Sequence, residues 1–189
     1  MEEALKMRID YLSTLPEDEV REIIESMNSE FRLELAKSPY LERCGKVCYK
    51  VLSEDEDWAI REAIAERDDL GEICPECIIK LARDGDSSVR EAIAERDDLS
   101  KICPKCIREL TKDDDFLVRW RIAKRKDLGK ICPECVRKLA KDKEWFIREA
   151  IAEREDLSQV CPECVEWLCN DEDVRSLIER RGLCKKIFK

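Results

Sequence analysis

A 29-residue period runs through most of this chain, and it limits the folds that the chain can adopt. Two motifs share the period: a charged segment, REAIAERDDL, and a cysteine motif, C-P-[EK]-C. Identical or altered copies of the first lie at 61–70, 90–99, 119–128 and 148–157. Copies of the second lie at 74–77, 103–106, 132–135 and 161–164. The sequence therefore predicts a repeat protein whose units stack on their neighbours.

Each unit reads as two helices. The first runs roughly over 58–67 and carries apolar residues at helical spacing. The second runs roughly over 75–82, where four apolar positions fall at i, i+3, i+4 and i+7, which is one face of a helix. The apolar positions are Ile60, Ala63 and Ile64 in the first helix, and Cys74, Cys77, Ile78 and Leu81 on the second face. We expect Leu70 and Ile73 to fill the connection, and helices this short to be stable only when packed.

The register extends beyond the clear copies. Subtracting 29 from Arg61 gives Arg32, which opens the divergent segment RLELAKSPYL. Residues 1–31 and 169–189 are expected to be terminal caps, because end units have one neighbour each. Pro16 opens a helix in the first cap, and two residues are missing before Val174 in the last. The predicted units of the array, 32–168, are 32–60, 61–89, 90–118, 119–147 and 148–168.

The pattern R-x-A-I-A-x-x-x-x-L, followed by a Pro-opened helix, resembles the leucine-rich repeat variant family of HEAT-like repeats, and RLELAKSPYL at 32–41 looks closest to it. The resemblance covers about 32–168. It implies an all-α, right-handed α-solenoid, and it transfers no catalytic residue. The founding member of that family carries an iron–sulfur cluster in a separate cysteine-bearing segment. This chain departs from the family because extra residues, which hold the C-P-[EK]-C motif, precede its second helix.

Composition excludes several classes of function. The net charge of −9 disfavours a nucleic-acid partner, which needs a basic surface. No apolar run is long enough to span a membrane. The N-terminus lacks a signal-peptide pattern, so we expect a cytoplasmic protein. Only three amides occur, Asn28, Gln159 and Asn170, which is typical of hyperthermophiles, whose cytosolic proteins can hold disulfides.

The paired cysteines favour disulfides within each motif. Cα atoms three residues apart in a helical turn lie about 5 Å apart, inside the range for a disulfide. The expected pairs are Cys74–Cys77, Cys103–Cys106, Cys132–Cys135 and Cys161–Cys164. Cys44 and Cys48 could bond despite their different spacing. Cys169 and Cys184 could join the C-terminal cap, so that all twelve cysteines form six bonds.

Three other roles for the cysteines stay open. They could be small apolar core residues. They could bind zinc or an iron–sulfur cluster, which usually needs four ligands. The best candidate set for that metal site is Cys44, Cys48, Cys74 and Cys77. Redox catalysis is the least favoured, because it needs an exposed nucleophilic cysteine and these lie on the predicted core face.

One unit departs from the others and is the candidate binding site. Its segment RWRIAKRK is basic and aromatic where the other copies are acidic. Trp and Arg are common at interface hot spots. The candidate patch is Arg119, Trp120, Arg121, Lys124 and Lys126. The competing interpretation is structural, since Lys124 could pair with Glu95 and Glu153 of neighbouring units.

Other singular residues have structural interpretations. Trp58, Phe116 and Trp145 share one repeat position, where we expect packing at the start of the first helix. We interpret the protein as a scaffold that binds a protein or peptide through a helical-repeat surface. It is expected to be neither an enzyme nor dependent on a cofactor, with neither membrane nor nucleic acid as partner. The alternative is a metal or iron–sulfur protein.

Overall fold

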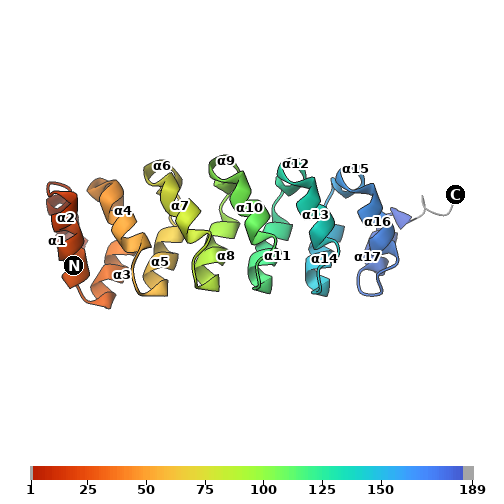
Figure 1. The fold of residues 1–189 in the computed structure, drawn as a ribbon, viewed down its shortest axis with the longest axis horizontal. Coiled ribbons are helices and arrows are strands. Elements are labelled where there is room, and N and C mark those ends of the chain that lie inside the picture. The colour runs from red at the N-terminus through yellow and green to blue at the C-terminus, as the bar shows by residue number, and fades with distance from the viewer. Residues whose placement is uncertain (1, 185–189) are drawn as a thin grey trace. The chain divides into compact units, whose positions relative to one another are not determined.

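The structure, a computed structural model, describes residues 2–184 (Figure 1). Every regular element in that part of the chain is a helix, as the sequence predicts. Contacts divide the chain into two compact units: unit 1 is Met1–Ile102 and unit 2 is Cys103–Lys189. The extreme ends of the predicted caps, residue 1 and residues 185–189, lie outside the described residues.

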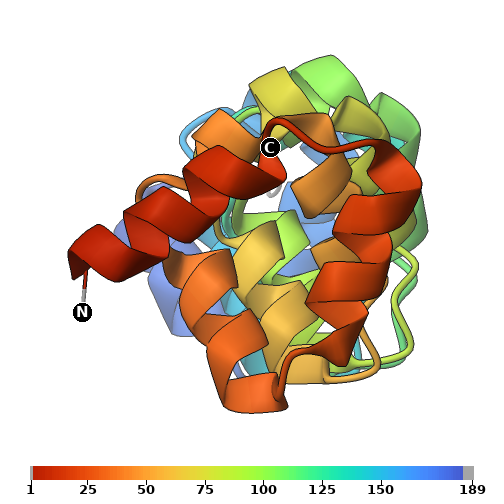
Figure 2. The ribbon, with the colours of Figure 1, turned by 90° about the vertical axis from the view of Figure 1, so that its left-hand side faces the viewer.

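Unit 1 begins with the N-terminal helices and contains the first repeats. Its helices are α1 (Glu2–Leu12), α2 (Glu17–Ser26), α3 (Ser29–Lys37), the 3-10 helix η1 (Leu41–Cys44), α4 (Lys46–Ser53), α5 (Trp58–Ala65), α6 (Leu70–Ile73), α7 (Pro75–Leu81), α8 (Ser87–Glu95) and α9 (Leu99–Ile102). Figure 2 shows α1 running obliquely to α2 and α3, which are joined at their lower ends by a short turn.

Unit 2 continues the same order of elements. Its helices are α10 (Pro104–Leu110), α11 (Phe116–Lys124), α12 (Leu128–Ile131), α13 (Pro133–Leu139), α14 (Trp145–Ala152), α15 (Leu157–Val160), α16 (Pro162–Cys169) and α17 (Arg175–Arg180). Equivalent helices start at equivalent sequence positions: α11 and α14 begin 29 residues apart, and so do α12 and α15. The helix starts therefore follow the sequence period.

Each full repeat contains an additional helix of four residues between the two predicted helices, so the two-helix description of the sequence was incomplete. In α6, the buried Leu70 accepts a hydrogen bond of 2.8 Å at its main-chain oxygen from the N–H of Cys74, which closes a helical turn. Cys74 then adopts φ −140° and ψ 72°, which ends the turn, and Pro75 opens α7. Proline suits that place because the first residue of a helix needs no N–H partner.

The starts of α5, α8 and α11 are each fixed by an aspartate cap. Before α5, Oδ1 of Asp57 accepts a hydrogen bond of 3.0 Å from the N–H of Ala59. Asp86 and Asp115 hold the same place before α8 and α11 and accept in the same way. Such a cap satisfies one of the donors that a helix leaves unpaired at its N-terminus.

The core contains the apolar positions that the period picked out. Burial of one such side chain contributes about 1.5–3 kcal/mol. The fully buried recurring positions are Ile64, Ile93, Ile122 and Ile151 in the first helices, and Leu70, Leu99, Leu128 and Leu157 in the short helices. Pro16 precedes α2 as predicted, with Val20 and Ile24 buried. The third helix begins at Ser29, three residues before the predicted start of the array at Arg32.

The three aromatic residues at the start of the first helices are only partly packed. Trp58, Phe116 and Trp145 remain 47%, 44% and 51% exposed. Each is the first residue of its helix, α5, α11 or α14, directly after the cap residue. Phe116 and Trp145 contact the ring of Phe146, so the expected packing is present but incomplete.

Candidate functional site

All twelve cysteines are paired in six disulfides. In each C-P-[EK]-C motif, the first cysteine caps the third helix of the repeat and the second lies in its first turn. The two Cα atoms lie 5.3 Å apart in the pair Cys74–Cys77 and 5.2 Å apart in Cys161–Cys164. The six pairs are Cys44–Cys48, Cys74–Cys77, Cys103–Cys106, Cys132–Cys135, Cys161–Cys164 and Cys169–Cys184.

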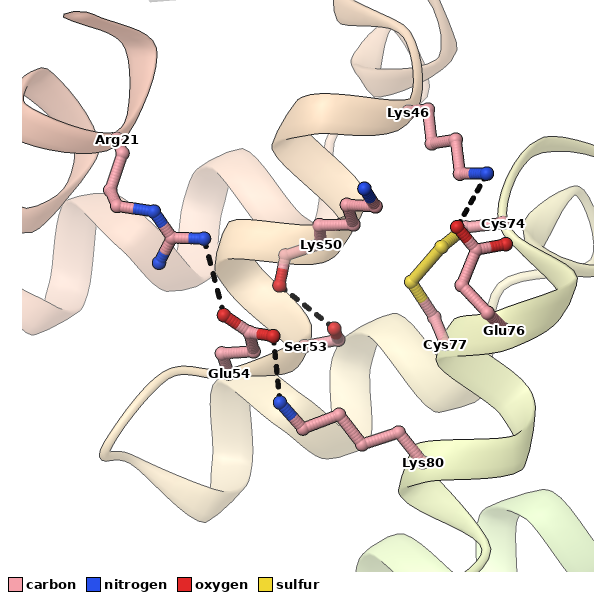
Figure 3. Close-up of a disulfide and its surroundings, with 9 residues drawn as sticks. All are labelled: Arg21, Lys46, Lys50, Ser53, Glu54, Cys74, Glu76, Cys77 and Lys80. Atoms are coloured by element: carbon pink, nitrogen blue, oxygen red, sulfur yellow. Dashed lines mark hydrogen bonds and ion pairs between the residues drawn. A yellow bond between two sulfur atoms is a disulfide. The ribbon is translucent and has the colours of Figure 1, made fainter. Parts of the chain in front are cut away.

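The motif sulfurs are out of reach of solvent. Cys74 is fully buried and Cys77 is 2% exposed. Figure 3 shows this disulfide behind an ion pair between Lys46 and Glu76, which joins α4 to α7 across the surface. A thiolate attacking a disulfide must reach one sulfur along the S–S axis, and access therefore controls the rate of exchange. Burial of both sulfurs therefore slows thiol exchange at this disulfide.

Glu54 forms a second surface bridge near the same disulfide (Figure 3). Its carboxylate accepts from Lys80 at 2.7 Å and from Arg21 at 3.2 Å, so that α7 and α2 are both tied to the end of α4. The hydrogen bond from Lys80 is the largest influence on the pKa of Glu54, and it lowers that pKa below its ordinary value. The pairs are half-exposed and each contributes less than about 1 kcal/mol.

The cysteines proposed as an alternative metal site bond in two separate pairs. Cys44 pairs with Cys48, and Cys74 with Cys77, so the four sulfurs do not converge on one point. Among residues 2–184, no group of three or more His, Cys, Asp or Glu side chains is arranged to hold a metal ion.

Within each unit, an arginine after the first helix ties a repeat to the preceding one, which the sequence pattern did not reveal. Nη1 of Arg67 donates to the main-chain oxygens of Ala36 and Ser38, at 3.0 and 2.8 Å. Its Nε and Nη2 donate to the carboxylate of Asp69 at 2.9 and 2.6 Å. The carbonyls lie at the end of α3, where a helix leaves its last oxygens without partners. Arg67 therefore caps the helix of another repeat.

The same contact recurs along each unit. In unit 1, Arg96 donates to the main-chain oxygen of Ala65 at 2.8 Å. In unit 2, Arg154 donates to that of Arg125 at 2.7 Å, and Arg181 to that of Arg154 at 2.9 Å. Arg181 follows Arg154 by 27 residues instead of 29, which agrees with the two residues missing before Val174. We call these four side chains the arginine staples: Arg67, Arg96, Arg154 and Arg181.

A second row of recurring arginines binds the aspartates that follow the last helix of a repeat. Nε and Nη2 of Arg61 donate to the two oxygens of Asp84 at 2.7 and 2.8 Å. Burial raises the pKa of Asp84, but the hydrogen bonds from Arg61 outweigh it and hold that pKa below its ordinary value. Equivalent pairs are Arg32–Asp55, Arg119–Asp142 and Arg148–Asp171.

Arg119 belongs to this second row and does not contribute to an exposed binding patch. Its side chain binds Asp142 at 2.8 and 3.0 Å and also donates to two main-chain oxygens of the turn before α11. The residue is 6% exposed. The sequence grouped it with Trp120 because both are basic or aromatic, although an arginine at this position recurs in every copy of the repeat.

The rest of the candidate patch lies on the surface of α11 and the turn after it. Trp120 and Arg121 are partly exposed, and the guanidinium carbon of Arg121 lies 5.2 Å from the centre of the Trp120 ring. Lys124 and Lys126 are exposed. The Nζ of Lys124 lies 3.3 Å from a carboxylate oxygen of Glu153, which confirms the expected ion pair with that neighbour.

The equivalent positions in unit 1 form an acidic surface. A hollow of about 450 Å³ lies between α5 and α8, lined by Glu66, Asp68, Ala92, Glu95, Arg96, Asp97 and Asp98. Beside it, burial raises the pKa of Glu62, and repulsion from Glu66 and Asp86 raises it further. The α11 repeat thus carries basic side chains at positions where α5 and α8 carry acidic ones.

Comparisons with known proteins add no family. The chain matches none of the protein-family models and none of the curated proteins against which it was compared. Within residues 2–184, no helix is both long and apolar enough to cross a membrane.

Proposed function

We propose that this protein is a helical-repeat scaffold that binds an acidic protein or peptide segment and is held rigid by disulfides. The observation that carries the proposal is the Trp120–Arg121 pair on α11. The corresponding residues of the neighbouring repeat are Glu149 and Ala150, so this pair is not needed to build the helix. A stacked aromatic ring and guanidinium group can bind a carboxylate and still offer apolar surface to a partner.

The basic side chains around the pair favour an acidic partner. Lys126 is exposed, and Lys124 lies beside it with only a half-exposed contact to Glu153. Such a surface ion pair is worth less than about 1 kcal/mol, so an incoming carboxylate can replace it at low cost. The structural interpretation of Lys124 and a binding role are therefore compatible.

The test compares wild type with Trp120→Glu/Arg121→Ala, which restores the residues of the other repeats. A library of random dodecapeptides is selected on each immobilised protein. We expect Asp- and Glu-rich peptides from wild type only. Enrichment of the same peptides on both proteins would remove this site from the proposal. Lys138→Ala, which changes an exposed lysine on α13, is the matched control and keeps the wild-type selection.

We further propose that the repeats form a right-handed solenoid of the leucine-rich repeat variant type. The support is the residue pattern at 61–70 and its copies, together with helices that start 29 residues apart within each unit. Extended surfaces of stacked repeats commonly bind peptides. A binding role also suits a chain whose motif sulfurs are buried, and we propose no enzymatic activity and no cofactor.

The rival function is a metal or iron–sulfur protein. Its only support is the number of cysteines, because the structure pairs each of them within a disulfide. Purification without oxygen, followed by metal analysis and a visible absorption spectrum, separates the two. Stoichiometric zinc or iron, or a cluster band, would favour the rival.

We also propose that the protein works in the cytoplasm of a hyperthermophile. Six disulfides are typical of a non-reducing compartment, and hyperthermophiles are the recognised exception for cytosolic proteins. The low amide content supports this choice.

A further inference from the structure

Two neighbouring helices of unit 2 each begin with a pair of bulky apolar residues. α11 begins with Phe116 and Leu117, and α14 begins with Trp145 and Phe146. Phe116, Leu117 and Trp145 are 44%, 40% and 51% exposed. Large apolar side chains scattered singly are common on surfaces, but a contiguous group usually marks an interaction site.

The three rings form one patch, and Leu117 follows Phe116 at the start of α11. The ring of Phe146 lies edge-to-face against Phe116, with centres 5.7 Å apart, and against Trp145 at 5.9 Å. Phe146 therefore joins the two helix starts, and α11 and α14 pack side by side (Figure 1). We call Phe116, Leu117, Trp145 and Phe146 the aromatic patch.

The fold does not require these residues. α8 begins with Ser87 and Ser88 at the same repeat positions, and its cap, Asp86, accepts the same hydrogen bond from the main chain. The acidic cap and the buried positions of the helix are sufficient to start it. Exposure of Phe116, Leu117 and Trp145 to water thus has no role in starting the helices.

The charges at the rim of the patch are arranged in a self-complementary way. Asp114 and Lys143 hold equivalent positions, each just before the cap residue of its helix, and both are exposed. The exposed charge is therefore negative before α11 and positive before α14, where the Nζ of Lys143 also lies 4.0 Å from a carboxylate oxygen of Glu144. A two-fold axis through the patch would bring each Asp114 against the Lys143 of the other copy.

We propose that the aromatic patch is the contact surface of a homodimer, in which a second copy of this chain docks by a two-fold axis and pairs Asp114 with Lys143 twice. A self-complementary rim fits a second copy, since an unrelated partner would need no such symmetry. The surface is small, so the dimer is reversible and depends on protein concentration.

The first test removes the apolar contact. Phe116→Ser/Leu117→Ser gives α11 the first two residues of α8, so helix formation is preserved. Sedimentation equilibrium should show a concentration-dependent dimer for wild type and at least a tenfold weaker one for the variant. Trp58→Ser, which removes an exposed tryptophan of unit 1, is the control and should dimerise like wild type. A monomeric wild type, or a variant that dimerises equally well, would overturn the proposal.

The second test reverses the charges. Asp114→Lys alone places lysine against lysine, and Lys143→Asp alone places aspartate against aspartate, so each should associate more weakly than wild type. An equimolar mixture of the two variants restores both pairs and should form heterodimers. Association of each single variant at wild-type strength, or no gain in the mixture, would contradict the two-fold arrangement. Circular dichroism of each variant confirms that the helices are retained.

Discussion

Arg154 donates a hydrogen bond of 2.7 Å to the main-chain oxygen of Arg125, the residue that holds the same position one repeat earlier. The same guanidinium binds its own repeat through Asp156, at 2.9 Å from both Nε and Nη2. One side chain thus joins the end of α11, the turn after α14 and the next short helix. Because the contact spans one period, a repeated sequence can produce it between successive repeats within each unit.

Loss of a staple should cost more than loss of a surface ion pair. Arg154→Ala leaves a buried carbonyl oxygen without its donor and Asp156 without its partner, which should lower the free energy of unfolding by about 2 kcal/mol. Arg137→Ala is the control, since Arg137 pairs with Glu163 on the surface and is half-exposed. Its cost should stay below about 1 kcal/mol. Urea unfolding measures both, and equal costs would show that the staple has no special role.

Gly129 is predicted to tolerate no side chain. A Cβ at that position would overlap Oδ2 of Asp156 and lie 2.9 Å from a methyl carbon of Val160. Gly129→Ala should therefore destabilise the protein by about 1–3 kcal/mol. A Cβ at Gly85 would meet no atom within 4 Å, so Gly85→Ala should be neutral or slightly stabilising. Thermal unfolding of the two variants checks the contrast; a similar fall in both would contradict it.

Acid should weaken the second arginine row. Burial raises the pKa of Asp142, but the hydrogen bonds from Arg119 outweigh it, so its pKa in the folded protein is lowered. The unfolded chain then binds a proton at higher pH than the folded one, near its ordinary pKa of about 3.9. The pair therefore contributes its full stability above the unfolded-state pKa of Asp142. That contribution is lost as the pH falls through the lowered pKa of Asp142 in the folded protein.

Asp142→Asn measures this loss. The gap in unfolding free energy between wild type and variant should be largest near neutral pH and shrink below about pH 4. Denaturant titrations at several pH values give the gap directly. A gap that stays constant down to low pH would mean that Asp142 does not titrate with a lowered pKa.

The six disulfides should differ in their contribution to stability. Cys169–Cys184 closes a separation of 15 residues at the C-terminal end, whereas Cys103–Cys106 closes one of three. Chain-entropy arguments give about 3 kcal/mol for the longer loop and less for a shorter one. We expect Cys169→Ala/Cys184→Ala to lower the urea midpoint more than Cys103→Ala/Cys106→Ala. The reverse order would show that the motif bonds act through the folded state.

Sequence reasoning predicted the helices well where the period was clear. The buried face of Cys77, Ile78 and Leu81 follows from helical spacing alone, and the disulfide pairs follow from their separation in a helical turn. The short helix at Leu70–Ile73 was missed because four residues make less than two helical turns, too few to show helical spacing of apolar residues. Its existence depends on burial of Leu70, which is a tertiary effect.

The sequence predicted the surface residues less well than the core, because the charge of a side chain does not determine how exposed it is. Arg119 looked like part of a basic patch, yet it is buried against Asp142. Arg67 was assigned no role from the sequence, yet it caps another helix. In both cases the available signal was the recurrence of the arginine in successive copies of the repeat. Phe116 was predicted in part, since its ring contacts Phe146 and yet 44% of the residue is exposed.

Thiol counting in protein taken directly from cells shows whether disulfides reinforce the repeat scaffold. Cells are lysed in denaturant with an alkylating reagent and no reductant, and the intact mass is measured. We predict no alkylated cysteine, and, after digestion, the four motif pairs, Cys44–Cys48 and Cys169–Cys184 as cross-linked peptides. Alkylation of all eight motif cysteines would contradict the account and favour a thiolate role such as metal binding.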